Sequence, residues 1–214
     1  MKKVSLNDIA QKLGVSKTLV SLVLNGKAKE HRISDDIIRK VTRLAHELNY
    51  KPNQIAKGLR TGKTNTIGLI IADIANPFFG KLGREIENEA AVHGYRVMFC
   101  SSDEKAENSQ KQIEMLLQGQ VDGFIISPPE GSEEQIRELE KRGKPYVLID
   151  RYFPGIDSNY VIVDNFRATY DATRHLIQKG YTGVTCITID IQLENMQQRL
   201  EGFKQALSDS SIPL

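Results

Sequence analysis

The chain has 214 residues, of which 40% are apolar and 26% charged, and its formal net charge is +2. This composition is typical of a globular protein of one or two domains, and no apolar run reaches the length of a transmembrane helix. Cys100 and Cys186 form no CxxC pair and the four histidines are scattered, which predicts neither a disulfide framework nor a metal site. The polar start predicts no secretion signal, so we expect a cytoplasmic protein.

The charge is distributed unevenly along the chain. Residues 1–63 carry 14 lysines and arginines against 5 acidic residues, whereas the remaining 151 residues carry 15 against 22. A basic segment attached to an acidic remainder indicates that the basic segment binds a polyanion. An ordinary solvated surface is the alternative, but it is less consistent with so large an excess in so short a stretch.

Three short helices are predicted in residues 1–52, each with an apolar stripe at helical spacing. The first begins at the capping box of Ser5 and Asp8 and ends at Gly14, and the second begins at Ser16. Two helices joined by one tight turn, with a third helix behind them, make a helix-turn-helix domain.

The second of these helices is the predicted DNA reader. A recognition helix places its N-terminal residues against base edges in the major groove, and the outward residues there are Lys17, Thr18 and Ser21. A plain helical hairpin is the alternative, but the positive charge and the order of the caps favour DNA. The third helix begins at Ser34 and ends at residues 49–52.

Residues 53–65 form a predicted linker with one short helix. Asn53 is placed to cap this helix, and Ile55, Ala56 and Leu59 share a face. A helix of two turns with an internal glycine is marginal in water. The linker is therefore either a flexible basic tether or a segment that is disordered alone and folds on binding.

From residue 66 the pattern changes to alternating strands and helices. TIGLIIA, YRVMFC, VDGFIIS and PYVLID are apolar and rich in β-branched residues, as in buried parallel strands. Amphipathic stretches at 79–93 and 105–119 separate them. This alternation predicts a doubly wound α/β lobe over 66–164.

Residues 165–214 are predicted to form only part of a second lobe. They contain two helical stretches, 166–179 and 196–208, and one expected strand near 184–189. Such an incomplete lobe would expose apolar surface on Ile187, Ile189, Leu200 and Phe203.

Polar and aromatic side chains follow the predicted strands, and ligands on such sheets bind at the carboxyl ends of the strands. The candidates are Asp73, Asn76, Phe78, Phe79, Ser102, Asp103, Ser127, Asp150 and Arg151. Polar groups with an aromatic wall suit a hydroxyl-rich ligand such as a sugar. Asp73 and Asp150 form either an acid–base pair or hydrogen-bonding groups for a ligand, and we favour the second. No GxGxxG, P-loop or GxSxG motif indicates a nucleotide or an acyl substrate.

Long motifs in a fixed order resemble a known family. LNDIAQKLGVSKTLVSLVLNG, YKPNQIAKGLR, IGLIIADIANPFFGKLGREIENEAAVHGY, VDGFIISP, VLIDR, VIVDN and HLIQKGY are similar to the lactose-repressor (LacI/GalR) family of bacterial transcription regulators. The resemblance covers nearly the whole chain. It implies a small all-α helix-turn-helix head and an α/β doubly wound parallel-sheet body like that of periplasmic sugar-binding proteins, with the second lobe incomplete.

The resemblance implies a sequence-specific DNA-binding regulator, expected to be a repressor, without cofactor, catalytic residue or membrane contact. Its implied partners are near-palindromic double-stranded operator DNA, a second copy of the chain in a homodimer, and a small effector expected to be a carbohydrate. The implied DNA contacts are Ser5, Ser16, Lys17, Thr18, Ser21, Leu22, Asn25, Lys29, Arg32, Tyr50, Asn53, Ala56, Lys57, Leu59 and Arg60.

Two details of the resemblance bear on specificity. Asp150 and Arg199 match positions that contact effector in the family, although Arg199 would also fit a surface ion pair. Leu22 stands where many members have an arginine, and the turn after the second helix looks longer than usual, with Lys27, Lys29 and Arg32 as replacement backbone contacts.

The resemblance also implies a role for residues 53–60. It implies a hinge that becomes helical only on DNA, where Leu59 would act as a wedge between base steps.

Two other hypotheses stay open. One is a sugar-modifying α/β enzyme with a DNA-binding head, which would need a nucleophile or a phosphate loop at a strand end. The other is an operator-binding fragment without effector control, which would bind DNA equally with and without sugars or purines.

Overall fold

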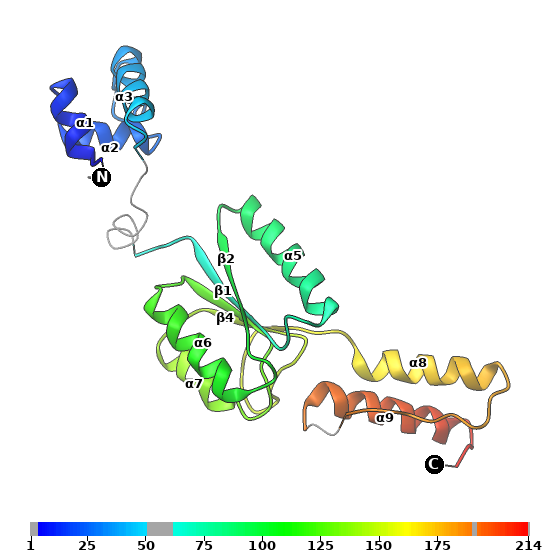
Figure 1. Ribbon diagram of the computed structural model, residues 1–214. Coiled ribbons are helices and arrows are strands. Elements are labelled where there is room, and N and C mark those ends of the chain that lie inside the picture. The colour runs from blue at the N-terminus through cyan, green and yellow to red at the C-terminus, as the bar shows by residue number, and fades with distance from the viewer. Residues whose placement is uncertain (1–3, 51–61, 190–191, 214) are drawn as a thin grey trace. The chain divides into compact units, whose positions relative to one another are not determined.

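The computed structural model describes residues 4–50, 62–189 and 192–213 (Figure 1). The chain divides into two compact units, Met1–Arg60 and Thr61–Leu214, which we call the head and the body. None of the helices in the described ranges combines the length and the apolar character that a bilayer crossing requires.

The head contains the three expected helices, α1 (Leu6–Leu13), α2 (Lys17–Leu24) and α3 (Asp35–Glu47). The predicted capping box begins α1, because the Ser5 hydroxyl accepts the Asp8 N–H and the Asp8 carboxylate accepts the Ser5 N–H at 2.7 Å. Gly14 ends α1 in the left-handed region at φ +65°. The helix-turn-helix prediction is confirmed.

The core of the head lies where its three helices meet. Ile9, Val20 and Val41, one from each helix, have no exposed surface. Ala28, in the turn between α2 and α3, is 5% exposed and packs on the same cluster. The backbone carbonyl of Ala28 accepts the Ile33 N–H at 3.0 Å, so this long turn is attached to the core rather than free.

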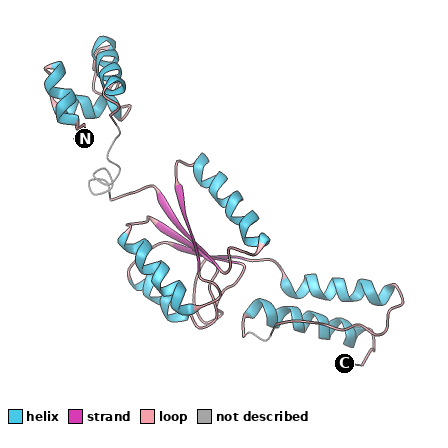
Figure 2. Ribbon diagram, in the orientation of Figure 1, coloured by secondary structure: helices cyan, strands magenta, loops and turns pink. Residues whose placement is uncertain are grey.

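The body is built on a five-stranded sheet (Figure 2). Its strands are β1 (Thr66–Ile71), β2 (Arg96–Ser101), β3 (Gly123–Ile126), β4 (Tyr146–Ile149) and β5 (Tyr160–Val161). They pair in parallel in the order β2-β1-β3-β4-β5. The predicted parallel sheet is confirmed, and β5 is a short addition to the four expected strands. The expected burial of β2 is wrong: it is an edge strand without a fully buried residue, and Met98 is 42% exposed.

Helices cover both faces of this sheet, as a doubly wound lobe requires (Figure 1). One face carries α5 (Pro77–Val92), and the other carries α6 (Ala106–Gln118) and α7 (Glu133–Lys141). Helix α7 was not predicted from the sequence, and its buried residues are only Ile136 and Leu139. Nine residues with so few apolar positions give a weak helical periodicity.

The remainder of the body holds α8 (Asn165–Gln178) and α9 (Glu194–Asp209), which lie side by side (Figure 1). The strand expected near residues 184–189 is wrong: this segment has no secondary structure, and Ile187 is 93% exposed. A strand forms only with a neighbour to bond, and β-branched residues alone do not supply one. Phe203 was expected to be exposed but is 8% exposed, because it packs within the body, whereas Leu200 is half-buried.

A glycine allows α8 and α9 to approach closely. A Cβ added at Gly202 would meet the backbone carbonyl oxygen of Phe166 well inside contact distance and lie 3.1 Å from the Tyr170 nitrogen. Backbone atoms cannot move aside as a flexible side chain can. We therefore expect Gly202→Ala to destabilise the body by about 2 kcal/mol through overpacking, measured by urea unfolding. Gly183→Ala, where a Cβ meets nothing within 4 Å, is the matched control, and an equal loss in both variants would contradict the close packing.

Candidate functional site

The start of α2 presents the proposed DNA-reading residues. Ser16 caps the helix, since its hydroxyl accepts the Leu19 N–H at 3.1 Å. Lys17 and Thr18 follow it and are both exposed. Ser21 is half-buried, and the Asn25 side-chain amide donates to its carbonyl oxygen at 2.7 Å. Lys17 and Thr18 are thus the side chains with the freest access to a partner.

The turn after α2 places three further cations on the surface of the head. Lys27, Lys29 and Arg32 are exposed, and Arg32 adopts a left-handed φ of +53°. The Arg32 N–H donates to the Lys29 carbonyl at 3.1 Å, so the turn has a defined conformation. This arrangement can offer guanidinium and ammonium groups to phosphates.

The other residues expected to contact DNA differ in their exposure and in their structural roles. Ser5 and Ser16 both serve as helix caps. Leu22 is half-buried, and Tyr50 packs against the core of the head, where burial raises the pKa of its phenol. The hinge candidates lie outside the described residues: Asn53, Ala56, Lys57, Leu59 and Arg60.

The candidate ligand site of the body lies at the carboxyl edge of the sheet. From β1 the chain proceeds to β2 on one side of it and later to β3 on the other, which makes β1 the point where the strand order reverses. Crevices at such points are the usual ligand sites of open α/β sheets. The predicted ligand residues follow β1, β2, β3 and β4 at this edge.

The loop after β1 is held by its own side chains. Asp73 Oδ1 accepts the Ala75 N–H at 2.8 Å, and Asn76 Oδ1 accepts the Phe78 N–H at 3.0 Å, which caps α5. Phe78 is 50% exposed, but Phe79 is 3% exposed and packs against the sheet. In this structure Phe79 presents no surface to a ligand, so of the two rings only Phe78 can line one.

Two buried serines follow β2 and β3. Ser102 has no exposed surface, and its hydroxyl donates to the Ile71 carbonyl at 3.2 Å, which joins the end of β2 to the end of β1. Ser127 is equally buried, and its hydroxyl has no hydrogen-bond partner among the described residues. An unpaired hydroxyl in a buried position is costly unless a ligand or a water satisfies it.

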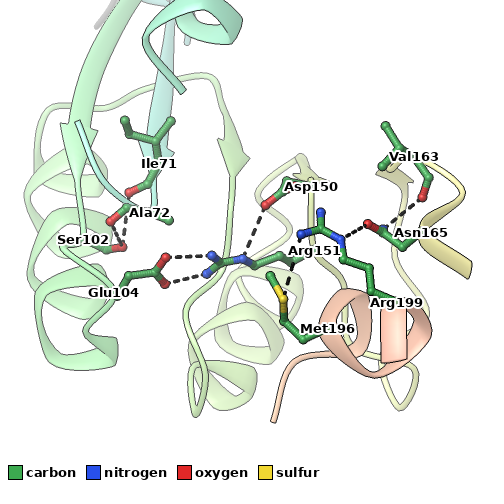
Figure 3. Close-up of polar contacts among 10 residues, drawn as sticks. All are labelled: Ile71, Ala72, Ser102, Glu104, Asp150, Arg151, Val163, Asn165, Met196 and Arg199. Carbon is green, nitrogen blue, oxygen red and sulfur yellow. Dashed lines mark hydrogen bonds and ion pairs between the residues drawn. The ribbon is translucent and has the colours of Figure 1, made fainter. Parts of the chain in front are cut away.

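A cluster of charges joins the ends of β2 and β4 (Figure 3). Arg151 is 5% exposed, and its two terminal nitrogens donate to the two Glu104 oxygens at 2.6 and 2.7 Å. Its Nε lies 3.4 Å from Asp150 Oδ2. Burial raises the pKa of the Asp150 carboxyl, while the charges of Arg151 and Arg199 oppose that rise. We call Glu104, Asp150 and Arg151 the Arg151 cluster.

Backbone conformation marks the same edge. Asp103, Glu104 and Asp150 have φ of +51°, +57° and +65°, in the left-handed region that non-glycine residues seldom adopt. Such conformations cost free energy and gather at functional sites. Glu104 was not among the predicted site residues, and no local sequence pattern could identify it, because its partner is 47 residues away.

Arg199 reaches from α9 toward the Arg151 cluster (Figure 3). It is half-buried, and its Nε donates to Asn165 Oδ1 at 2.8 Å. Asn165 is 2% exposed and donates in turn to the Val163 carbonyl at 3.1 Å. Arg199 is therefore held by a buried amide rather than by a surface carboxylate. Across the described ranges, no three histidine, cysteine or acidic residues are grouped so that they could hold a metal ion.

Comparison with known families matches both units. Residues 64–214 match the family described as periplasmic binding proteins and sugar binding domain of LacI family, and residues 5–53 match the bacterial regulatory proteins, lacI family. The chain is similar to the HTH-type transcriptional regulator DegA of Bacillus subtilis (strain 168), with 34% identity over 215 residues, covering 99% of this chain and 63% of DegA.

Solved structures are similar as well. The lac repressor bound to ONPG in the repressed state has 25% identity and a TM-score of 0.85 over 99% of this chain and 64% of that one. The Cra transcriptional dual regulator from Pseudomonas putida, in complex with fructose 1-phosphate, has 25% identity and a TM-score of 0.64 over 67% of this chain and 54% of that one. The chain thus spans less than two thirds of the length of these relatives.

Proposed function

The chain belongs to the LacI family of bacterial regulatory proteins, and from this membership we propose that it is a sequence-specific DNA-binding transcriptional regulator controlled by a small ligand. We propose a helix-turn-helix domain over 1–52, a hinge over 53–65, a first ligand-binding lobe over 66–164 and part of a second lobe over 165–214. Repression is the proposed mode of action.

The start of α2 is the observation that carries the DNA-binding half of the proposal. Lys17 and Thr18 stand exposed at the N-terminus of a capped helix, where a recognition helix meets base edges. Lys29 and Arg32 add positive charge in the following turn. One such head contacts few bases, so we propose a homodimer on a near-palindromic operator.

The residues at the carboxyl edge of the sheet support the proposal that the body binds a small ligand. Carboxylates, a buried serine hydroxyl and a half-buried arginine meet there, and these groups can bond the hydroxyls of a carbohydrate. The matched family is described by sugar binding, and the similar Cra structure contains fructose 1-phosphate. We therefore propose a carbohydrate effector, bound by Asp73, Asn76, Phe78, Ser127, Asp150 and Arg199.

An enzymatic function is less well supported. An acid–base pair of Asp73 and Asp150 would need both carboxyls available to a substrate. Instead Asp73 accepts the Ala75 N–H of its own loop, and Asp150 pairs with Arg151. The relatives named above are transcriptional regulators.

Salt dependence and base preference separate the two kinds of DNA contact. We expect Lys29→Ala and Arg32→Ala to weaken binding to all sequences similarly and to flatten log affinity against log salt by about 0.9 for each phosphate that the variant no longer neutralises. Thr18→Ala should change the preferred base at one operator position by about 1–3 kcal/mol. Selection from a random DNA pool, followed by fluorescence anisotropy, measures both effects.

The control for charge is Arg39→Ala on α3, which also removes one positive charge and whose guanidinium lies 4.0 Å from Asp36. It should leave the base preference unchanged and affect the salt slope less than the turn variants do. If Thr18→Ala and Ser21→Ala both keep the base preference, α2 is not the reader.

Effector control is tested against the hypothesis of a DNA-binding module alone. We expect a bound sugar to change operator affinity by roughly 5–150-fold, the usual range of coupling between sites. If sugars and purines leave the affinity unchanged although DNA binds, the module alone is the better description. Turnover of the same compounds would instead favour the enzyme.

A further inference from the structure

Arg151 is the best-buried cation at the carboxyl edge of the sheet, but it is already occupied. Both terminal nitrogens bond Glu104, and Asp150 lies beside its Nε. A guanidinium binds phosphate best through two parallel N–H···O hydrogen bonds. In Arg151 the nitrogens that would make them already bond a carboxylate. Arg151 therefore acts as a structural cation in this state.

The geometry of Glu104 shows that this occupation is built into the fold. Two consecutive left-handed residues, Asp103 and Glu104, turn the chain at the end of β2. The Glu104 N–H donates to the Ala72 carbonyl at 3.0 Å, which attaches the turn to the end of β1. Ser101 donates to Asp103 Oδ1 at 2.6 Å and accepts the Ile74 N–H, so the loops after β1 and β2 are joined. These bonds fix the position of Glu104, so its pairing with Arg151 is not the chance contact of a mobile surface side chain.

The charges at this edge of the sheet then favour one class of ligand. Glu104 and Asp150 place two negative charges against the single positive charge of Arg151, and Asp103 adds a third at the same edge. A phosphate group brings a charge of about −1.5 to −2 at neutral pH, which these carboxylates oppose. An uncharged polyol instead offers hydroxyl donors that carboxylates accept. Arg199 contributes one cation, partly balanced by Asp150.

We propose that this edge of the sheet binds an uncharged polyhydroxy ligand in preference to its phosphate ester, and that Glu104 sets this preference by occupying the guanidinium of Arg151. The inference rests on the proposed carbohydrate effector and narrows its chemical class. Fructose 1-phosphate, which the similar Cra structure contains, belongs to the class of ester that this proposal disfavours for this chain.

The test compares matched sugars and esters by isothermal titration calorimetry with the full 214-residue chain. The pairs are fructose with fructose 1-phosphate, glucose with glucose 6-phosphate, and ribose with ribose 5-phosphate. We expect the sugar of the recognised pair to bind at least about tenfold more tightly than its ester. Ester binding that equals or exceeds sugar binding in every pair would overturn the proposal, and so would the absence of binding by all six compounds.

Glu104 variants test the residue itself. Glu104→Gln keeps the shape and removes the charge, which frees Arg151, so the ratio of sugar to ester affinity should fall by about tenfold or more. Glu104→Asp keeps the charge and should retain the preference. Glu107→Gln, three residues later and paired with the exposed Lys111, removes the same charge as a matched control and should leave the ratio unchanged.

Two outcomes would remove Glu104 from this role. The first is an equal fall in the ratio for Glu104→Gln and Glu107→Gln, which would show a long-range charge effect. The second is an unchanged ratio in Glu104→Gln. DNA binding, followed separately by anisotropy, distinguishes these outcomes from failure of the proposed regulatory function, because none of these variants alters the head.

Discussion

Replacing Arg151 by methionine is expected to lower the free energy of unfolding of the body by about 3 kcal/mol at neutral pH. Methionine keeps an unbranched apolar stem but removes the guanidinium, and the Asp150 carboxylate then stays buried without its partner. Removing one member of a buried ion pair typically costs about 3–5 kcal/mol. We expect the lower end because the Glu104 side chain is 46% exposed and water can solvate it.

The loss should depend on pH in a defined direction. Burial already raises the pKa of Asp150 above its ordinary value, and Arg151 opposes that rise. Without Arg151 the folded-state pKa rises further, so the folded protein binds a proton that the unfolded chain releases. The loss of unfolding free energy in Arg151→Met is therefore largest above the folded-state pKa of Asp150. It decreases as the pH falls through this value toward the unfolded-state pKa. Urea unfolding followed by circular dichroism at several pH values measures this trend.

An exposed ion pair supplies the comparison for this prediction. Arg142 bonds Glu138 at 2.8 Å on α7, where both side chains are about half exposed. Arg142→Met should cost at most about 0.5 kcal/mol, since exposed pairs contribute little. If Arg151→Met costs no more than Arg142→Met, the Arg151 cluster does not stabilise the body. A deficit that grows as pH falls would contradict the role assigned to Asp150.

Local patterns made the head predictable from the sequence. The capping box of Ser5 and Asp8 and the left-handed Gly14 act within one turn of helix, so their spacing in the sequence is their spacing in space. The sheet of the body was predictable for a related reason. Its four main strands come from continuous apolar runs, and their alternation with helices leaves few topologies.

The parts that could not be predicted depend on distant partners. Glu104 meets Arg151 only because β2 and β4 end at the same edge of the sheet. The left-handed backbone of Glu104 could not be predicted either, because no glycine at that position indicates it. The segment 184–189 has the composition of a strand, but it pairs with no other strand in the part of the chain that the structure describes. Phe79 looked like its neighbour Phe78 in the sequence, yet the helical turn directs it into the core.

Replacing Ile9 by alanine is expected to unfold the head at physiological temperature while leaving the body folded. Ile9 has no exposed surface and packs with Val20 and Val41 at the centre of the head. Loss of a buried isoleucine side chain costs about 2–5 kcal/mol. A domain of roughly 50 residues buries too small a fraction of its surface to spare that much. The body is a separate compact unit with its own cores, so it should not share the loss.

Differential scanning calorimetry and DNA binding together measure this result. The unaltered chain should show two transitions, and in Ile9→Ala the one that belongs to the head should move down by many degrees or disappear, with specific DNA binding abolished. Ile37→Ala, a half-buried residue of the same cluster, removes the same atoms and should cost about half as much. Cavity formation scales with how completely the removed side chain was surrounded, which gives this order. A single transition that shifts as a whole in Ile9→Ala would mean that head and body unfold cooperatively, and the DNA-binding unit would then have no independent stability.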